Sequence, residues 1–216
     1  MEKAKAAAFQ DNIKTVKKAA RANARLLLKG LSAAEREEQS QKAAALFLNS
    51  SIYKGSECVA AFFSLADEVD VFPIIARAFI DKKRVLLPRI VAGSNAMDFY
   101  ELAAPVLGVQ NLASALEAQT EANAWGIREP LPTLPLVSKD KIPARTAILV
   151  PGLAFCKDGR RLGRGKGFYD RYLSELLAAN PAFAGRGKIC GYCMAVQIAD
   201  TVPTEENDVR VQALFC

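Results

Sequence analysis

The stretch "TAILVPGLAFCKDGRRLGRGKGFYDRYLSELLAAN", residues 146–180, decides the fold class of this chain. Its first part, 146–155, is an apolar run that predicts a buried strand ending at Pro151-Gly152. A glycine-rich basic segment follows, and a helix is predicted to begin near Gly167 and to stop at Asn180-Pro181. A strand, a glycine loop and a helix in this order are typical of a mostly parallel sheet that is covered by helices.

The same alternation continues on both sides of this stretch. Buried strands are predicted at 57–65, 84–90 and 187–196, with a hairpin-like piece near 96–102 and a last short strand at 209–215. Pro88 is expected to break the second of these strands. The span 101–145 holds five prolines and is predicted to be a long loop with one helical turn.

Three helices are predicted before the glycine stretch, at 12–29, 32–49 and 70–83. Gly30 ends the first helix, and Ser32 with Glu35 forms a capping box for the second. Pro73 lies in the first turn of the third. We therefore expect one α/β domain over 1–216, with a mostly parallel central sheet, helices on both faces in an α/β/α layering, and the N-terminal helices 12–49 packed on this core.

The composition restricts the chemistry. The 216 residues carry a net charge of +6, which suits an anionic ligand, and they include no histidine. The absence of histidine excludes Ser-His and Cys-His nucleophiles and a histidine general base. Catalysis by position and electrostatics, or by carboxylate, lysine or metal, remains.

The N-terminal sequence and the cysteines favour a cytoplasmic protein. No apolar run approaches the roughly 20 residues that span a bilayer, and the charged, alanine-rich start lacks the core of a secretion signal. The five cysteines are an odd number, and "CGYC", Cys190–Cys193, lies in an apolar stretch. A zinc site would need more ligands, so we predict that these two thiols lie buried in a strand.

The glycine segment itself predicts a phosphate site. Gly163, Gly165 and Gly167 allow several backbone N–H groups to point into one concavity, and the N-terminus of the following helix adds partial positive charge. Arg161, Arg164 and Lys166 add direct charge, and Asp170 is placed to hold a divalent cation that bridges phosphates. The spacing matches neither GxGxxG nor GxxxxGK[ST], and the alternative is a solvated basic turn.

The segment "VPGLAFCKDGRRLGRGKGFYDRYL", 150–173, resembles the signature of the 5-formyltetrahydrofolate cyclo-ligase family, the 5,10-methenyltetrahydrofolate synthetases. The resemblance extends to "LSAAER", "SLADEVD", "LPRI", "WGIREP" and "VPTEENDVRV". It implies a monomeric enzyme that uses ATP and Mg²⁺ to close the ring of 5-formyltetrahydrofolate, polyglutamylated or not. The formyl oxygen is phosphorylated, N10 attacks the activated carbon, and phosphate leaves. No nucleic acid and no membrane is implied.

The resemblance also implies roles for individual residues. For ATP binding they are Lys17, Arg21, Arg161, Leu162, Gly163, Arg164, Gly165, Lys166, Gly167, Phe168 and Tyr169. For folate binding they are Phe63, Glu68, Trp125, Arg164, Gly165, Lys166, Gly167 and Phe168. Catalytic roles fall to Arg164, Lys166 and Tyr169, and Mg²⁺ binding to Asp170 and Asp208. Phe168 stands where the family often has tyrosine.

Simpler interpretations of these residues, and other functions, remain as alternatives. Lys17 and Arg21, four residues apart, share a helix face that is equally read as ordinary exposed basic surface. Glu68 and Asp208 by themselves read as solvated loop charges. The rival functions are a basic nucleic-acid-binding module, with Phe168 and Tyr169 stacking on bases, and a different ATP-dependent kinase or ligase on a similar sheet.

Overall fold

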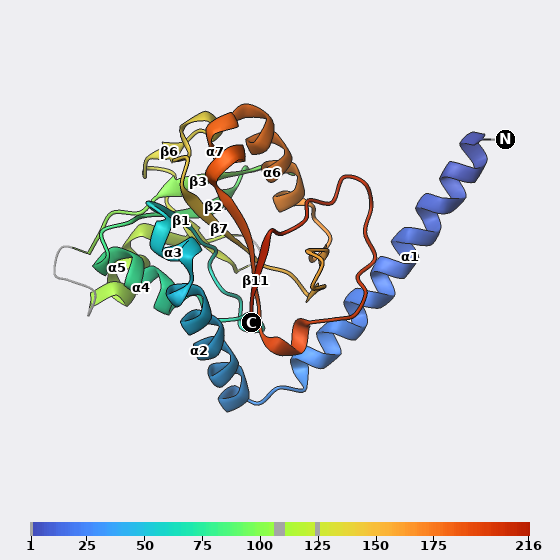
Figure 1. The fold of residues 1–216 in the computed structure, drawn as a ribbon, viewed down its shortest axis with the longest axis horizontal. Helices are drawn as coiled ribbons and strands as arrows, with labels where there is room; N and C mark the ends of the chain where they lie inside the picture. Colours follow the sequence, from blue (N-terminus) through green and yellow to red (C-terminus); the bar gives the residue numbers. More distant parts are fainter. Residues whose placement is uncertain (1, 106–110, 124–125) are drawn as a thin grey trace.

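The computed structural model describes residues 2–105, 111–123 and 126–216 of the chain, and its centre is a seven-stranded sheet. The sheet has the order β11-β10-β7-β1-β2-β3-β6 (Figure 1). Neighbouring strands are parallel from β11 through β2, whereas β3 is antiparallel to both β2 and β6. The strands are β1 Cys58–Ala60, β2 Arg84–Ile90, β3 Met97–Glu101, β6 Leu136–Val137, β7 Thr146–Val150, β10 Lys188–Tyr192 and β11 Ala213–Phe215.

Side chains that alternate along each strand build two separate cores. Val59 points into one core, while its neighbours Cys58 and Ala60 point into the other. In β7, Ala147 and Leu149 join the first core, and Ile148 and Val150 the second. Both faces of the central strands are therefore buried, as the near-continuous apolar runs predicted.

Helices cover both faces of the sheet. Residues of α1, α2, α3, α4 and α5 lie in the first core, and residues of α6 and α7 in the second. The helices are α1 Glu2–Lys29, α2 Ala33–Asn49, α3 Ser51–Gly55, α4 Phe72–Ile80, α5 Leu112–Gln119, α6 Phe168–Ala179 and α7 Pro181–Arg186, with short 3₁₀ turns at Lys139–Lys141 and Ala195–Gln197. The predicted α/β/α layering is confirmed. Among the described residues, no helix is both long and apolar enough to cross a membrane.

The first helix begins earlier than predicted. It starts at Glu2 rather than near residue 12, and its N-terminal end projects away from the body of the molecule (Figure 1). Its C-terminal part packs on the core through Ala24 and Leu28, and the chain turns at Gly30. The capping box of α2 is confirmed: Ser32 Oγ accepts from Glu35 N at 3.2 Å, and the Glu35 carboxylate accepts from Ser32 N at 2.8 Å.

The prediction for 101–145 was wrong. Instead of a loop with one helical turn, this span holds α5, β6, the 3₁₀ turn and a hairpin of β4 Thr120–Ala122 with β5 Arg128–Pro130. Strands of two or three residues are too short to show a period in the sequence, and the prolines around them are typical of loops. Tertiary packing fixes the hairpin, because Arg89 at the end of β2 donates to Pro130 O at 2.7 Å.

Other boundaries differ by a few residues. Strand β1 covers only Cys58–Ala60, and β2 continues through Pro88, which pairs with Phe99 of β3. The missing N–H of Pro88 is tolerated because β1 pairs with β2 only as far as Leu86. Cys190 lies in β10 and Cys193 directly follows it, and both are free thiols with 0% exposure, as predicted.

The glycine stretch is more structured than a simple strand-to-helix loop. After β7, β8 Ala154–Phe155 and β9 Arg161–Leu162 form a small antiparallel hairpin before the chain reaches α6. Gly167 is the N-cap of α6 with φ 68°, and Gly165 has φ 108°, both in the left-handed region that favours glycine. The hairpin carries the basic loop across the ends of the strands.

Candidate active site

A cavity of about 290 Å³ lies at the carboxyl ends of the parallel strands. Residues that directly follow β1 and β7 line it together with the last residues of β2, and open α/β sheets bind ligands at this end of their strands. The lining residues are Lys17, Arg21, Phe62, Phe63, Leu65, Glu68, Pro88, Ile90, Met97, Ile127, Arg128, Glu129, Pro151, Gly152, residues 161–170, Glu205 and Asp208.

Nearly all the residues that sequence reasoning selected line this one cavity. They come from α1, from the segment after β1, from the glycine loop and from the loop before β11, regions as far apart as Lys17 and Asp208. Trp125 lies outside the described residues. The fold therefore brings the selected residues together, whereas their roles remain proposals.

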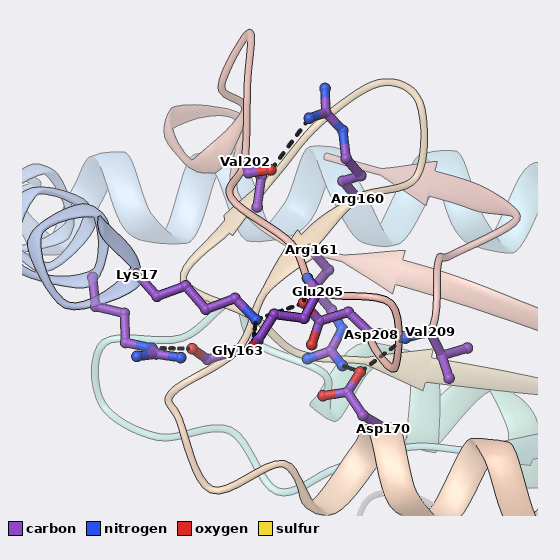
Figure 2. Close-up of polar contacts among 10 residues, drawn as sticks. Lys17, Arg160, Arg161, Gly163, Asp170, Val202, Glu205, Asp208 and Val209 are labelled. Carbon is purple, nitrogen blue, oxygen red and sulfur yellow. Dashed lines mark hydrogen bonds and ion pairs between the residues drawn. The ribbon is translucent and has the colours of Figure 1, made fainter. Parts of the chain in front are cut away.

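Lys17 is buried, with 6% exposure, in contrast to the exposed Lys14 and Lys18 on the same helix. Its Nζ lies 2.6 Å from Glu205 Oε2 and 2.6 Å from Asp208 Oδ2 (Figure 2). Asp208 Oδ2 also accepts from Glu205 N at 2.7 Å. Lys17 is thus not part of an ordinary solvated face, and Asp208 is not an isolated loop acid.

Arg21 attaches the first helix to the glycine loop. Its Nε donates to Gly163 O at 2.9 Å, and a Cβ built at Gly165 would come within 3.3 Å of its guanidinium carbon. Glycine at 165 therefore serves two purposes, a positive φ and close packing against the arginine. Lys17 and Arg21 do share one helix face, and it faces the cavity.

Arg161 and Asp170 form a buried ion pair at the start of α6. Arg161 Nη2 lies 2.7 Å from Asp170 Oδ1, the same oxygen that accepts from Val209 N at 3.1 Å (Figure 2). The Arg161 side chain is 4% exposed, and its Nε is buried without a partner among the described residues. An unsatisfied buried donor of this kind is expected where a ligand completes the site.

The donor set suits a magnesium ion only in part. Within the described part of the chain, no donor contacts Asp170 Oδ2 or Asp208 Oδ1, so each carboxylate keeps one open oxygen. No group of three metal-ligating side chains occurs there. Two carboxylates with open oxygens fit Mg²⁺ that takes its other ligands from phosphate and water.

Glu68 and Arg164 link the glycine loop to the segment after β1. Arg164 Nε lies 2.9 Å from Glu68 Oε1, and its Nη2 lies 2.5 Å from Asp67 Oδ1. The other Glu68 oxygen accepts from Leu65 N at 3.0 Å. Burial raises the pKa of Glu68, and the positive charge of Arg164 opposes that rise. Glu68 is therefore a buried, fully paired carboxylate, and the alternative of a solvated loop charge does not hold for it.

The end of the glycine loop is fixed by Arg171 and followed by two aromatic residues. Arg171 Nε donates to Asn95 O at 2.7 Å, and its Nη2 donates to Lys166 O. Tyr169, the second residue of α6, lines the cavity, and its hydroxyl is buried without a partner among the described residues. Burial also raises the pKa of Tyr169, so its hydroxyl stays protonated at neutral pH.

Sequence reasoning missed two carboxylates of the cavity. In "EENDVR" three acids stand close together, and the resemblance implies a role for Asp208 without indicating Glu205. Glu129 lies in "WGIREP", within the span predicted to be a loop, where no local pattern indicates that its side chain is buried. It is buried, with 5% exposure, and it faces the cavity from the β4–β5 hairpin.

Comparison with known proteins identifies the family. A model of the 5-formyltetrahydrofolate cyclo-ligase family matches residues 13–216. The chain belongs to this family. It is similar to 5-formyltetrahydrofolate cyclo-ligase of Mus musculus, at 30% identity over 94% of each chain. It is also similar to the probable 5-formyltetrahydrofolate cyclo-ligase of Caenorhabditis elegans, at 31% identity over 94% of this chain and 93% of the other.

Solved structures agree with this assignment. The fold matches the NMR structure of Aquifex aeolicus 5,10-methenyltetrahydrofolate synthetase with a TM-score of 0.70 and 26% identity, over 93% of this chain and 89% of that one. The 5,10-methenyltetrahydrofolate synthetase from Mycoplasma pneumoniae matches with a TM-score of 0.63 over 92% of this chain and 97% of the other, and at 21% identity it shows the fold alone. The resemblance inferred from the sequence is confirmed.

Proposed function

We propose that the chain converts 5-formyltetrahydrofolate to 5,10-methenyltetrahydrofolate with consumption of ATP and release of ADP and phosphate. The main support for this proposal is that two chemically different surfaces line one cavity of about 290 Å³. One half is the glycine loop with Lys17, Arg21 and Arg161, which suits a polyphosphate. The other is an apolar surface with buried carboxylates, which suits a flat heterocycle with N–H donors.

In the proposed reaction the formyl oxygen attacks the γ-phosphorus of ATP, and ADP leaves. The N10 amine then adds to the activated formyl carbon, N10 loses its proton, and the C–O bond breaks so that phosphate departs with the electron pair. Such transfer depends mainly on alignment and on neutralising charge. Arg164 and Lys166 would supply positive charge, and Tyr169 would donate a hydrogen bond from its unpartnered hydroxyl.

Mg²⁺ would be held by the open oxygens of Asp170 and Asp208, and when bound it would neutralise phosphate charge. Lys17 contacts the other oxygen of Asp208, Oδ2, so the proposed metal ligand and this ion pair use different atoms of the carboxylate. Phe63, Glu68 and Trp125 are proposed to contact the folate. The basic residues Lys17, Arg161 and Arg164 line one cavity instead of spreading over an exposed surface, which argues against a nucleic-acid-binding surface.

We further propose a single-domain monomer that acts on mono- or polyglutamylated folate. The cytoplasmic location expected from the sequence stays a prediction, and the Arabidopsis thaliana relative is described as mitochondrial.

The test is absorbance near the methenyl-folate band after the protein is mixed with Mg-ATP and 5-formyltetrahydrofolate. We expect a rise that requires all three components, with parallel reactions lacking ATP or Mg²⁺ as controls. Folded protein that binds ATP but gives no rise would contradict the proposed substrate and keep only the phosphate site. A rise that persists with EDTA in place of Mg²⁺ would refute the metal requirement alone.

A further inference from the structure

Glu129 is a buried carboxylate that forms no ion pair with any of the described residues. Its Oε1 accepts from Ile90 N at 3.1 Å and from Asn123 Nδ2 at 2.9 Å. The nearest arginine in sequence, Arg128, donates to Thr120 Oγ1 at 2.9 Å and to the backbone carbonyls of Glu117 in α5 and Thr120 in β4. Burying an ionised group without a counter-charge is costly, so such a group is retained where a ligand supplies the missing donor.

The second oxygen of Glu129 is open. Within the described part of the chain, no donor contacts Oε2, and this atom is accessible to solvent. Since Glu129 lines the cavity, its Oε2 presents a free acceptor there. Glu68 differs, because Arg164 and Leu65 N already occupy both of its oxygens.

The sheet order places Glu129 two strands from the start of the phosphate loop. Arg161 donates to Pro151 O, directly after β7, Glu68 follows β1, and Glu129 is bonded to the end of β2, so these three side chains lie in the order of neighbouring strands β7, β1 and β2. Two strand spacings amount to about 10 Å. A folate that accepts a phosphoryl group from a nucleotide held beside Arg161 lies in the rest of the cavity, which Glu129 lines.

We propose that Glu129 is a substrate-binding residue, whose Oε2 accepts a hydrogen bond from an N–H group of the reduced folate; this rests on the proposed function. The carboxylate repels phosphates and the glutamate tail of folate. Uncharged N–H donors remain, which the reduced pterin and the N10 amine provide. The adenine amino group of ATP is the other donor that the reaction offers, and the KM of ATP distinguishes the two.

Glu129→Gln tests the free atom alone. Two donors face Oε1, so the glutamine oxygen takes that position, and an NH₂ donor replaces the acceptor at Oε2. We expect the Kd of 5-formyltetrahydrofolate, measured by titration calorimetry on the full chain, and its KM to rise at least tenfold. We expect the KM of ATP to stay within twofold and the Tm to stay unchanged. The matched control is Glu121→Gln, the cross-strand neighbour of Glu129, whose carboxylate pairs with Arg89 and is half exposed; its folate affinity should equal that of wild type.

Folate affinity within twofold of wild type in folded Glu129→Gln, with normal turnover by the wild-type chain, would overturn the role of Glu129 and leave the cyclo-ligase activity standing. A rise in the KM of ATP with unchanged folate affinity would overturn it in favour of an adenine contact. If Glu129→Gln does not fold, Glu129→Asp keeps the charge but withdraws the oxygen, and the same shift in folate Kd decides. A wild-type chain that neither binds nor converts the folate would refute the proposed function itself, and this inference with it.

Discussion

The two sides of the cavity treat their charges in opposite ways. On the loop side, formed by Lys17, Arg21, residues 161–170, Glu205 and Asp208, the cations Lys17, Arg161 and Arg164 already contact carboxylates. The strand side is formed by Phe62, Phe63, Pro88, Ile90, Met97, Ile127 and Glu129, and its buried carboxylate has an open oxygen and no ion pair with a residue that the structure describes. The loop side therefore has to exchange partners when it binds an anion, whereas the strand side only has to accept a donor.

The physical reason lies in the cost of burial. Lys17 and Arg161 have side chains that are 8% and 4% exposed, and an unpaired buried charge destabilises a protein by several kcal/mol. The neighbouring carboxylates offset this cost, so that both cations stay buried in the folded protein without nucleotide. Phosphate then competes with Glu205, Asp208 and Asp170 for them, which makes binding weaker but the unliganded site stable.

Arg164→Ala is expected to have the largest effect, because this residue connects the two sides. Its loss removes positive charge from the transferred phosphoryl group and leaves the buried Glu68 without its counter-charge. We expect kcat/KM to fall on the order of 100-fold. Arg160→Ala is the control, since Arg160 belongs to the same segment, pairs with Asp158 and is absent from the lining of this cavity. The assignment fails if circular dichroism shows that the lost activity follows a lost folded fraction.

The two sides also differ in how far the sequence could predict them. Residues 159–173 specified the loop side locally, since glycines, cations and Asp170 stand next to each other in the chain. The positions of Lys17 and Asp208 came only from the family resemblance, because nothing local brings α1 to the loop before β11. Glu129 could not be predicted at all, because its environment depends on a hairpin of two three-residue strands that only tertiary packing holds.

Tyr169→Phe tests whether an unsatisfied group on the loop side waits for a ligand. Removing a buried hydroxyl without a partner should stabilise the unliganded protein by about 1 kcal/mol. If substrate satisfies that hydroxyl, kcat/KM should fall roughly tenfold at the same time. Tyr172→Phe is the matched control, because its hydroxyl is also buried and unpartnered among the described residues but the residue does not line the cavity. It should gain stability at unchanged kcat/KM; equal activity of both variants would count against a catalytic Tyr169.

Glu205→Gln tests the competition between carboxylate and phosphate. It removes one of the two negative charges that hold Lys17, while Asp208 keeps the lysine in place. We expect the KM of ATP to fall roughly fivefold, about 1 kcal/mol, with the KM of folate unchanged. Glu206→Gln, an exposed neighbour that does not line this cavity, is the control. A rise in the KM of ATP would show instead that Glu205 helps to hold the nucleotide or its metal.

Glu68→Gln sharpens the comparison where the two sides meet, through the dependence of stability on pH. Burial raises the pKa of Glu68 above its ordinary value of 4.5, against the effect of Arg164. The folded chain thus keeps a proton that the unfolded chain loses, so Glu68 contributes stability below pH 4.5 that is lost as pH rises above it. The Tm of wild type minus that of Glu68→Gln should therefore decrease between pH 4 and 7. The pKa of Glu57 is lowered, mainly by the hydrogen bond that Arg145 N donates to its carboxylate. The Tm of wild type minus that of Glu57→Gln should therefore increase over the same pH range. Parallel slopes for the two variants would mean that the ion pair with Arg164 outweighs burial and lowers the pKa of Glu68, as the hydrogen bond from Arg145 N lowers that of Glu57.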